Sequence, residues 1–319
     1  MRGKWIRQKI RDAIVDYVKY WKNRAGFPDG FFLSRLGIAR RRIADWRERY
    51  GLPNRHNGHV PRVGQLDEWE KDYIIDYYLS HPLDGYRRVA YMMIDENSVV
   101  ASPPTVYRVL RKAGVLRKWN DKTSKKGDGF DQPTRPHEHW HTDVSYINVN
   151  GTFYYLCAIL DGYSRYIVHW EIREKMETLD IQIIEQRALE KFSGVEPRLI
   201  TDNGPQFISK EFKKFIKISG MTHVKTSPFY PQSNGKIERF HGSLKRECIR
   251  PKTPLTLEDA RRATEKYVEH YNNVRLHSAV KYVTPKDKLE GREAEILETR
   301  KRRLKEARER RKSEFRKCA

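Results

Sequence analysis

Residues 141–173 read HTDVSYINVNGTFYYLCAILDGYSRYIVHWEIR, and this stretch decides the fold. It contains three runs rich in β-branched and aromatic residues, TDVSYINV, TFYYLCAILD and YIVHWEIR, which are separated by the turn sequences NVNG and DGYSR. Residues of these types favour strands, and short turns join strands that run antiparallel. The stretch therefore predicts three consecutive antiparallel strands.

The segments that follow alternate between helical and strand patterns. Helices are expected over residues 176–192, 209–219 and 234–248, and short strands are expected at RLITD and THVKTS between them. This order predicts an α/β core over residues 137–250, with a mixed five-stranded sheet and flanking helices. A helical extension of the core is expected over residues 251–290, since an amphipathic pattern runs from Leu257 to about Asn273.

Three carboxylates fall on different elements of this core. Asp143 lies in the first strand, Asp202 ends the fourth, and Glu238 lies near the start of the last helix, where the helix dipole favours a negative charge. The 58 residues 144–201 and the 35 residues 203–237 separate them. Phosphodiester chemistry is assisted by two divalent ions about 3.5–4 Å apart, and Mg²⁺ prefers oxygen ligands. The three carboxylates therefore predict a metal site for phosphoryl transfer.

Other acidic side chains are weaker candidates for the first ligand. Asp161 begins a turn between two predicted strands, and a turn-forming aspartate needs no metal to explain it. Glu174, Glu177 and Asp180 lie in or near a surface helix and are expected to be solvated.

The helix that carries Glu238 also carries His241, Gly242 and Lys245 at positions i+3, i+4 and i+7. This spacing puts them on one face of the helix, with Lys245 about 10.5 Å along the axis. A structural hydrogen bond and a catalytic role are equally open for His241. Lys245 is either a contact for a bound anion or a solvated surface lysine.

Four segments together resemble insertion-sequence transposases with a retroviral-integrase-type core: HTD, TDNGPQF, SPFYPQSNGKIERFHGSLKRE and YNNVRLHSAVKYVTPKD. The resemblance covers most of residues 80–288, and the 35-residue interval matches the D,D-35-E signature of that family. It implies a ribonuclease-H-like fold for the core. It also implies an enzyme that nicks transposon ends and uses the freed 3′ hydroxyl to attack DNA by in-line displacement, with no covalent enzyme intermediate.

The resemblance also implies the cofactors and DNA contacts of the core. In the family the first Asp bridges two Mg²⁺ ions, for which Mn²⁺ substitutes, while the second Asp and the Glu each bind one ion; these roles pass to Asp143, Asp202 and Glu238. A basic residue at the position of Lys245 contacts the transposon end, and the loop before the last helix positions DNA. The expected DNA contacts in the core are Lys245, His241, Asn203, Tyr230, Gln232 and Ser233.

One departure from retroviral integrases concerns zinc. Those enzymes carry an N-terminal His-His-Cys-Cys unit, whereas no cysteine precedes Cys157 in this chain. Five histidines therefore lack thiolate partners: His56, His59, His137, His139 and His141. We expect no zinc site and no viral origin.

Residues 1–52 are predicted to form a helical domain. Trp5, Ile6, Ile10, Ile14, Tyr17 and Trp21 recur mostly at helical spacing. FFLSRLGIARRRIADWRERYG then reads as a helix, a glycine turn at Gly37, and a second helix with Ile43, Trp46 and Tyr50 inward. This anatomy is typical of a helix-turn-helix, as in the N-terminal part of many transposases. Its expected DNA contacts are Arg40, Arg41, Arg42 and Arg47; the alternative is a plain packed helical pair.

A second helical module is expected over residues 66–118, between a linker at 53–65 and a charged connector at 119–136. Its helices are predicted at 66–79, 86–95 and 104–113. HPLDGYRRVAYMMI and TVYRVLRKAGVLRK resemble a transposase module that binds DNA through its last helix, which implies contacts from Arg108, Arg111 and Lys112. A basic helix face without specific contacts is the alternative. Residues 291–319 alternate basic and acidic residues and predict a solvated, charged helical tail.

Composition supports a polyanionic partner. The formal net charge is +22 and 12% of residues are aromatic, which indicates a nucleic acid. The resemblance implies that this partner is double-stranded DNA, both as transposon terminal inverted repeats and as target DNA. No segment approaches the roughly 20 apolar residues that cross a bilayer, and the N-terminus lacks the features of a secretion signal, so we expect no membrane partner. The three cysteines suit a reducing interior, which favours a cytoplasmic, nucleoid-associated protein of a bacterium.

Synapsis of two DNA ends suggests a homodimer or a higher homo-oligomer. Two other functions remain as alternatives: a DNA-binding regulator that performs no chemistry, and a nuclease that hydrolyses DNA–RNA hybrids with the same metals. The intact carboxylate set argues against the first alternative. The 35-residue interval, Lys245 and the two helical modules argue against the second.

Overall fold

The three strands expected from residues 141–173 form the centre of a sheet in the computed structural model. β1 (His139–Val149), β2 (Thr152–Asp161) and β3 (Ile167–Arg173) are antiparallel, with β2 in the middle. β4 (Arg198–Thr201) and β5 (Thr222–Lys225) run parallel to β1, so the strand order is β3-β2-β1-β4-β5. The mixed five-stranded sheet that the sequence predicts is confirmed.

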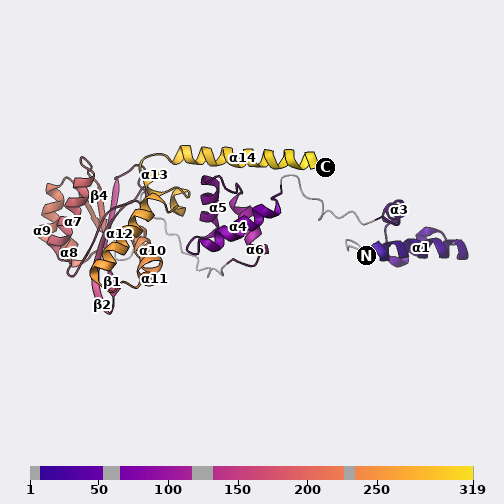
Figure 1. The fold of residues 1–319 in the computed structure, drawn as a ribbon, viewed down its shortest axis with the longest axis horizontal. Helices are drawn as coiled ribbons and strands as arrows, with labels where there is room; N and C mark the ends of the chain where they lie inside the picture. The colour runs from indigo at the N-terminus through magenta and orange to yellow at the C-terminus, as the bar shows by residue number, and fades with distance from the viewer. Residues whose placement is uncertain (1–7, 53–64, 117–131, 226–233, 319) are drawn as a thin grey trace. The chain divides into compact units, whose positions relative to one another are not determined.

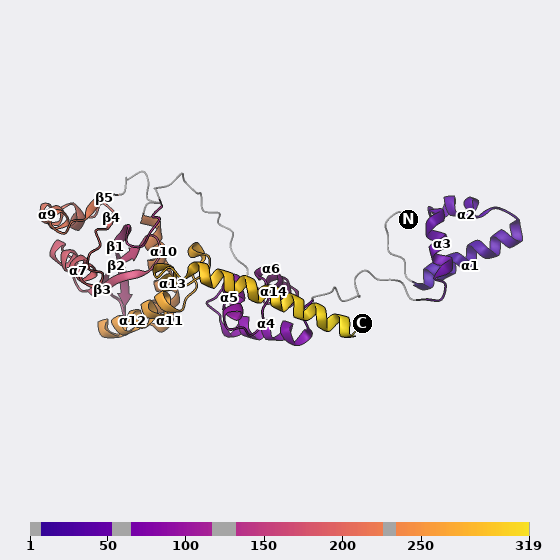
Figure 2. The same ribbon diagram turned by 90° about the horizontal axis from the view of Figure 1, so that it is seen from above.

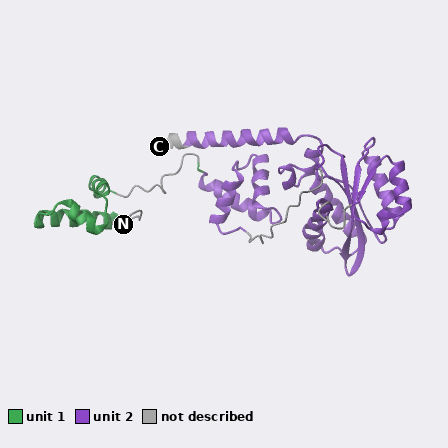
Figure 3. Ribbon diagram, turned by 180° about the vertical axis from the view of Figure 1, so that it is seen from behind, with its two compact units in different colours: residues 1–65 green, residues 66–319 purple. Residues whose placement is uncertain are grey.

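The structure describes residues 8–52, 65–116, 132–225 and 234–318. They belong to two compact units, residues 1–65 (the N-terminal unit) and residues 66–319 (the C-terminal unit), which Figure 3 colours separately. Each unit is described by itself. The finer subdivision of the C-terminal unit stays a prediction.

Helices cover both faces of the sheet (Figure 1). On one face, α7 (Thr178–Lys191), the short α8 (Pro205–Ile208) and α9 (Lys210–Ile218) pack around the fully buried Trp140 of β1. On the other face, α10 (Gly235–Leu244) and α12 (Leu257–Asn273) pack around Phe240. A π-helical turn, η2 (Lys245–Ile249), and the short α11 (Arg250–Lys252) continue α10. The sequence pattern predicts α7, α9, α10 and α12, but not α8, α11 or the π-helical form of η2.

The second helical module is formed by α4 (Glu68–Ser80), α5 (Tyr86–Asp95) and α6 (Pro103–Lys112). Prolines occupy the first turn of α6, where a missing N–H costs nothing, and Gly114 follows the helix with a φ of +72°. Val106 and Leu110 face inward, so the basic residues of α6 remain on its outer side.

The C-terminal helix is not the solvated tail that its composition predicts. α14 (Glu293–Cys318) is helical as expected, but one of its faces packs against the helical module (Figures 1 and 2). Arg300 and Arg311 are buried on this face; Arg300 donates to Asp95 at 2.7 Å and Arg311 donates to Glu70 at 2.6 Å. The expectation of a solvated helix is wrong for this face, because both arginines are buried and form ion pairs with the helical module.

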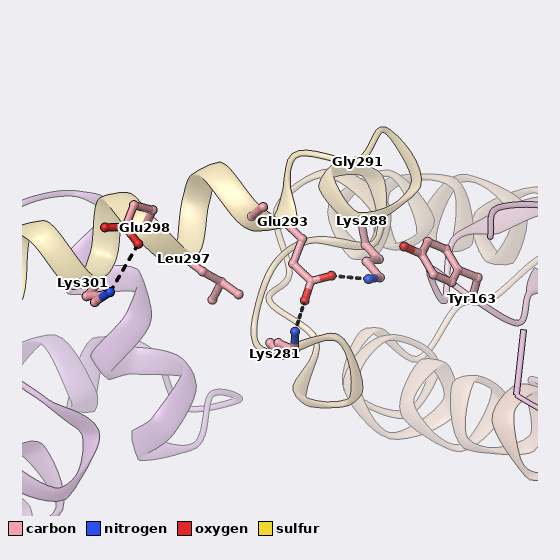
Figure 4. Close-up of a pocket in the computed structure, with 9 residues that line it drawn as sticks. Tyr163, Lys281, Lys288, Gly291, Glu293, Leu297, Glu298 and Lys301 are labelled. Atoms are coloured by element: carbon pink, nitrogen blue, oxygen red, sulfur yellow. Dashed lines mark hydrogen bonds and ion pairs between the residues drawn. The ribbon is translucent and has the colours of Figure 1, made fainter. Parts of the chain in front are cut away.

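The start of α14 is fastened to the preceding helix α13 (Pro285–Leu289), as Figure 4 shows. The carboxylate of Glu293 bridges two ammonium groups, with Lys281 at 2.7 Å and Lys288 on its other oxygen. Lys288 also lies 4.3 Å from the centre of the Tyr163 ring, in a cation–π contact. The charged side chains that line the hollow in Figure 4 are therefore already paired with one another.

The N-terminal unit contains α1 (Gln8–Ala25), α2 (Asp29–Leu36) and α3 (Arg40–Glu48). The expected glycine turn is present, since Gly37 ends α2 with a φ of +65°. Ile43 and Trp46 of α3 are buried as predicted, whereas Tyr50 is 49% exposed and donates to Asp16.

The expected apolar face of α1 is only partly right. Val15 and Val18 are the buried apolar residues of α1, and the predicted Ile14 packs against the same cluster, while Ile10, Tyr17 and Trp21 are exposed. Trp5 and Ile6 lie outside the described residues. Among the helices that the structure describes, none is long and apolar enough to cross a membrane.

Candidate active site

The sheet brings two of the three predicted carboxylates to the same level. β1 and β4 pair in parallel, with His141 opposite Ile200. Asp143 and Asp202 each follow two residues later, so the register brings them to adjacent positions at the carboxyl end of β4. Asp202 is held by the backbone N–H of Gly204, which donates to its Oδ1 at 2.9 Å.

Glu238 reaches the same place from a helix. It lies in the first turn of α10, as the sequence predicts, and its side chain is exposed. The preceding Asn234 is 3% exposed and donates through Nδ2 to the backbone oxygen of Thr142 at 3.4 Å. The start of α10 is thus tied to β1 one residue away from Asp143.

The pKa values of Asp202 and Glu238 both respond to burial and to neighbouring carboxylates. Burial raises the pKa of Asp202, and the nearby Asp143 raises it further. Burial also raises the pKa of Glu238, to which Asp143 and Asp202 both add. Carboxylates whose pKa is raised by burial and by a neighbouring negative charge form a site that attracts cations.

His241 is placed inside the protein, where it supports Asp143. Its side chain is 4% exposed, and its Nδ1 lies 3.3 Å from Oδ2 of Asp143. Its Nε2 is buried without a hydrogen-bond partner among the described residues. This burial favours the structural role over a direct DNA contact, which stays a prediction.

Lys245 lies on the same side of the sheet as Asp143. Its ammonium donates to the hydroxyl of Ser145 at 2.7 Å. Burial lowers the pKa of Lys245, and the Asp143 carboxylate raises it. The ammonium of Lys245 and the carboxylate of Asp143 therefore interact electrostatically. A lysine at this position can contact a phosphate that is bound beside a cation at the carboxylates.

Asp161, the rival candidate for the first metal ligand, accepts hydrogen bonds within the fold. Its side chain is buried in the turn between β2 and β3. One oxygen accepts from the backbone of His137 at 2.8 Å, and the other accepts from the backbone and hydroxyl of Ser164. The turn role is confirmed, since both carboxylate oxygens accept hydrogen bonds from residues around the turn.

Glu185 is a residue that the sequence does not single out. It is fully buried on α7 and accepts a hydrogen bond of 2.7 Å from the hydroxyl of Thr142, the neighbour of Asp143. Its burial raises its pKa to about 8. A glutamate in a surface-like helix pattern gives no signal of this contact, because the partner lies 43 positions away.

The remaining predicted DNA contacts are scattered over the chain. Tyr230, Gln232 and Ser233 lie outside the described residues, and Asn203 is exposed beside Asp202. On α3, Arg40 and Arg41 are exposed, Arg42 lies over the Trp46 ring, and Arg47 forms an ion pair of 2.8 Å with Asp29. On α6, the exposed basic residues are Arg108, Arg111 and Lys112.

The donor chemistry of the site fits a hard divalent cation. All three candidate ligands offer carboxylate oxygens, which Mg²⁺ prefers. Within the described ranges, no group of three His, Cys, Asp or Glu side chains is already converged at metal-binding distance. The carboxylates are therefore neighbours by register and by charge, rather than a closed cage.

Comparison with known proteins identifies the same region. An integrase core domain family matches residues 133–231, and a second integrase core domain family matches residues 219–285. The first match contains Asp143 and Asp202, and the second contains Glu238.

Similar whole proteins are transposases. The transposase for insertion sequence element IS904 of Lactococcus lactis is 31% identical over 176 residues, which cover 51% of this chain and 69% of the relative. The transposase for IS629 of Shigella sonnei is 28% identical over 246 residues, covering 73% of this chain and 82% of the relative. A solved catalytic core domain of HTLV-2 integrase, in complex with magnesium, is 21% identical over 49% of this chain and 98% of that chain, with a TM-score of 0.40. The chain belongs to the insertion-sequence transposases, with a ribonuclease-H-like integrase core.

Proposed function

We propose that this transposase nicks transposon ends and joins the freed 3′ hydroxyl to DNA at a centre formed by Asp143, Asp202 and Glu238. The observation that carries the proposal is the approach of these carboxylates from β1, the end of β4 and α10, where burial and the Asp143 carboxylate raise the pKa of both Asp202 and Glu238. Proteins concentrate like charges in this way where a cation compensates them.

The same centre is proposed to hold two Mg²⁺ ions, for which Mn²⁺ substitutes. Asp143 would contact both ions, while Asp202 and Glu238 would each contact one. When bound, the ions activate the attacking oxygen, neutralise charge on the phosphate and stabilise the leaving oxygen. We propose no zinc.

The protein's own residues orient these groups. The contact with His241 holds the Asp143 carboxylate, and the Gly204 N–H holds Asp202. Lys245 offers its ammonium to the phosphate next to the reacting bond. Fixed partners of this kind keep the reacting atoms aligned for in-line displacement.

The partner is proposed to be double-stranded DNA, both as terminal inverted repeats and as target. Arg40 and Arg41 of α3 present exposed guanidinium groups, and α6 presents three more basic side chains. Arg42 and Arg47 would contribute after releasing Trp46 and Asp29. Pairing of two ends calls for at least a homodimer. The site of action would be the bacterial nucleoid.

A joining assay tests the proposal. Asp202→Asn keeps the shape of the side chain but removes its charge, so Mg²⁺-dependent joining of terminal DNA should fall to background while DNA binding persists. Glu211→Gln on α9 is the matched control, because it neutralises an exposed carboxylate of the same core. Undiminished joining by Asp202→Asn would overturn the proposal.

A further inference from the structure

A groove crosses the edge of β1 close to the carboxylates. β4 pairs with β1 only from His139 to His141, so no described strand covers that edge of β1 from Val144 onward. The groove has a volume of about 440 Å³ and lies between this edge, the turn after β1, and the segment from Lys245 to Leu255. Its size falls in the range of ligand-binding clefts.

One wall of the groove carries two exposed aromatic rings. Tyr146 is 57% exposed and Phe153 is 62% exposed. In the register of β1 and β2, Tyr146 lies opposite Tyr155 and Asn148 lies opposite Phe153. The rings of Tyr146 and Phe153 are therefore diagonal neighbours on one face of the hairpin. The Tyr155 ring, 5.0 Å from Tyr146, supports it from the side.

The other wall is basic. Lys245 and Arg250 line it, and Arg250 is exposed without a carboxylate partner among the described residues. No Asp or Glu belongs to the described lining of the groove. Lys245 begins the π-helical turn η2, and such turns recur at functional sites.

The groove is continuous with the candidate active site. Lys245 belongs to both the groove and the candidate active site, since it lines the groove and its ammonium interacts electrostatically with Asp143. Tyr146 follows Asp143 by three residues, which is about 10 Å along a strand. Its side chain points to the opposite face of the sheet, so the path from the carboxylates to the aromatic rings runs around the open edge.

We propose that this groove binds an unpaired nucleotide of the DNA next to the reacting phosphodiester. Lys245 and Arg250 take the phosphate, and the base stacks on Tyr146 and Phe153. Stacking on aromatic rings is tolerant of sequence because every base has a π face. The basic lining selects a polyanion over an apolar peptide segment. The inference rests on the proposed function, since it assigns a subsite of the same centre.

The test uses two probes that share the terminal sequence read from the DNA beside the gene. In one probe the terminal bases are mismatched and unpaired, and in the other the end is closed by a hairpin so that these bases stay paired. The double variant Tyr146→Ala/Phe153→Ala should bind the unpaired probe about tenfold more weakly. It should bind the closed probe as the wild type does. Tyr146→Trp/Phe153→Trp should restore binding, because stacking is kept.

Crosslinking locates the contact. With 5-iododeoxyuridine at an unpaired position, illumination of the wild-type complex should join DNA to a peptide that contains Tyr146 or Phe153. The control is Leu179→Ala, which removes an exposed apolar side chain of α7 and should change neither result. Both aromatic residues are exposed, so thermal unfolding of the double variant should match the wild type.

Several results would overturn the groove proposal. Equal weakening on both probes, no weakening on either, or crosslinks confined to other peptides would each do so. A change in the oligomeric state of the double variant by sedimentation would assign the groove to a contact between copies. Joining by the wild type is measured in parallel, so that a failure of the groove with joining intact is distinguished from a failure of the proposed function.

Discussion

Glu185 shows how burial changes the charge of a single residue. Burial raises its pKa from 4.5 to about 8, so folding takes up a proton between these pH values. Its contribution to stability is therefore unimpaired below about pH 4.5. The free energy of unfolding falls by up to about 1.4 kcal/mol per pH unit as the pH rises towards 8.

The variant Glu185→Gln tests this effect, because its amide is neutral at every pH. Its melting temperature should equal that of the wild type near pH 5 and exceed it near pH 8.5. Glu190→Gln, an exposed change on the same helix, should show no such divergence. A difference between Glu185→Gln and the wild type that does not vary with pH would contradict the buried, protonated state.

Lys245 is the residue at which the proposed DNA contact can be measured by its salt dependence. If its ammonium neutralises one phosphate, Lys245→Ala should lower the slope of log K against log salt by about 0.9. Lys245→Arg should retain most of the slope. Lys217→Ala, which removes an exposed charge from α9, serves as the control. An unchanged slope in Lys245→Ala would show that Lys245 does not contact a DNA phosphate.

At the scale of elements, α14 belongs to the fold of the C-terminal unit. Arg311 and Glu70 are joined by paired hydrogen bonds, with both side chains more than nine-tenths buried, and Arg311 also donates to the backbone of Val100 at 3.0 Å. Glu70 in turn closes the capping box at the start of α4 by accepting from Asp67. The end of α14 thereby stabilises the start of a helix far away in sequence.

Removal of one partner should be costly. Arg311→Met strands the Glu70 carboxylate in a buried position and should lower the free energy of unfolding by about 3–5 kcal/mol. Chemical denaturation measures this change. Arg308→Met, on the exposed side of α14, should cost less than about 0.5 kcal/mol.

A second substitution separates this pair from general damage to the helix. Glu70→Gln in the Arg311→Met background should recover part of the loss, since no charge is then left unpaired. Equal unfolding of Arg311→Met and Arg308→Met would show that α14 does not depend on this pair.

Sequence patterns predict those elements whose signals are local. Antiparallel strands, proline at the start of α6 and glycine after it are all visible within about ten residues. The packing of α14 cannot be read from such local signals, because Arg311 and Glu70 are 241 positions apart and look like ordinary surface charges in the sequence. The same limit explains α1, where aromatic residues at helical spacing suggest a core face that Val15 and Val18 instead provide.

The candidate site also contains residues that the sequence predicts and contacts that only the structure reveals. The spacing of the three carboxylates and the resemblance together point to Asp143, Asp202 and Glu238, and the register of β1 and β4 then explains why the first two are neighbours. The burial of His241 and the Glu185–Thr142 contact depend on packing between distant segments, which periodicity cannot reveal.

At the scale of the whole molecule, the net charge of +22 is expected to set the strength of the proposed DNA binding. Contacts with six or more phosphates should make affinity fall roughly a thousandfold or more between 50 mM and 200 mM salt. Equilibrium binding over a salt series measures this dependence. A flat dependence would contradict phosphate contacts as the main source of affinity.

The N-terminal unit should contribute the choice of sequence. In the full chain, Arg40→Ala/Arg41→Ala should reduce the preference for a terminal-repeat duplex over a scrambled one, by about 1–3 kcal/mol for each base contact that is lost. Lys19→Ala, an exposed change on α1, should leave the preference intact. An unaltered preference in the α3 variant would assign sequence reading to another part of the chain.

Three carboxylates from separate elements are proposed to form one cation site. The most direct measurement is backbone cleavage by Fe²⁺ bound in place of Mg²⁺, with ascorbate and peroxide, followed by mass spectrometry. A shared site predicts cuts close to Asp143, Asp202 and Glu238 together. Excess Mg²⁺ should suppress these cuts, and Asp202→Asn should weaken them at all three places. Cuts at only one of these places, or cuts that Mg²⁺ does not suppress, would contradict a shared site.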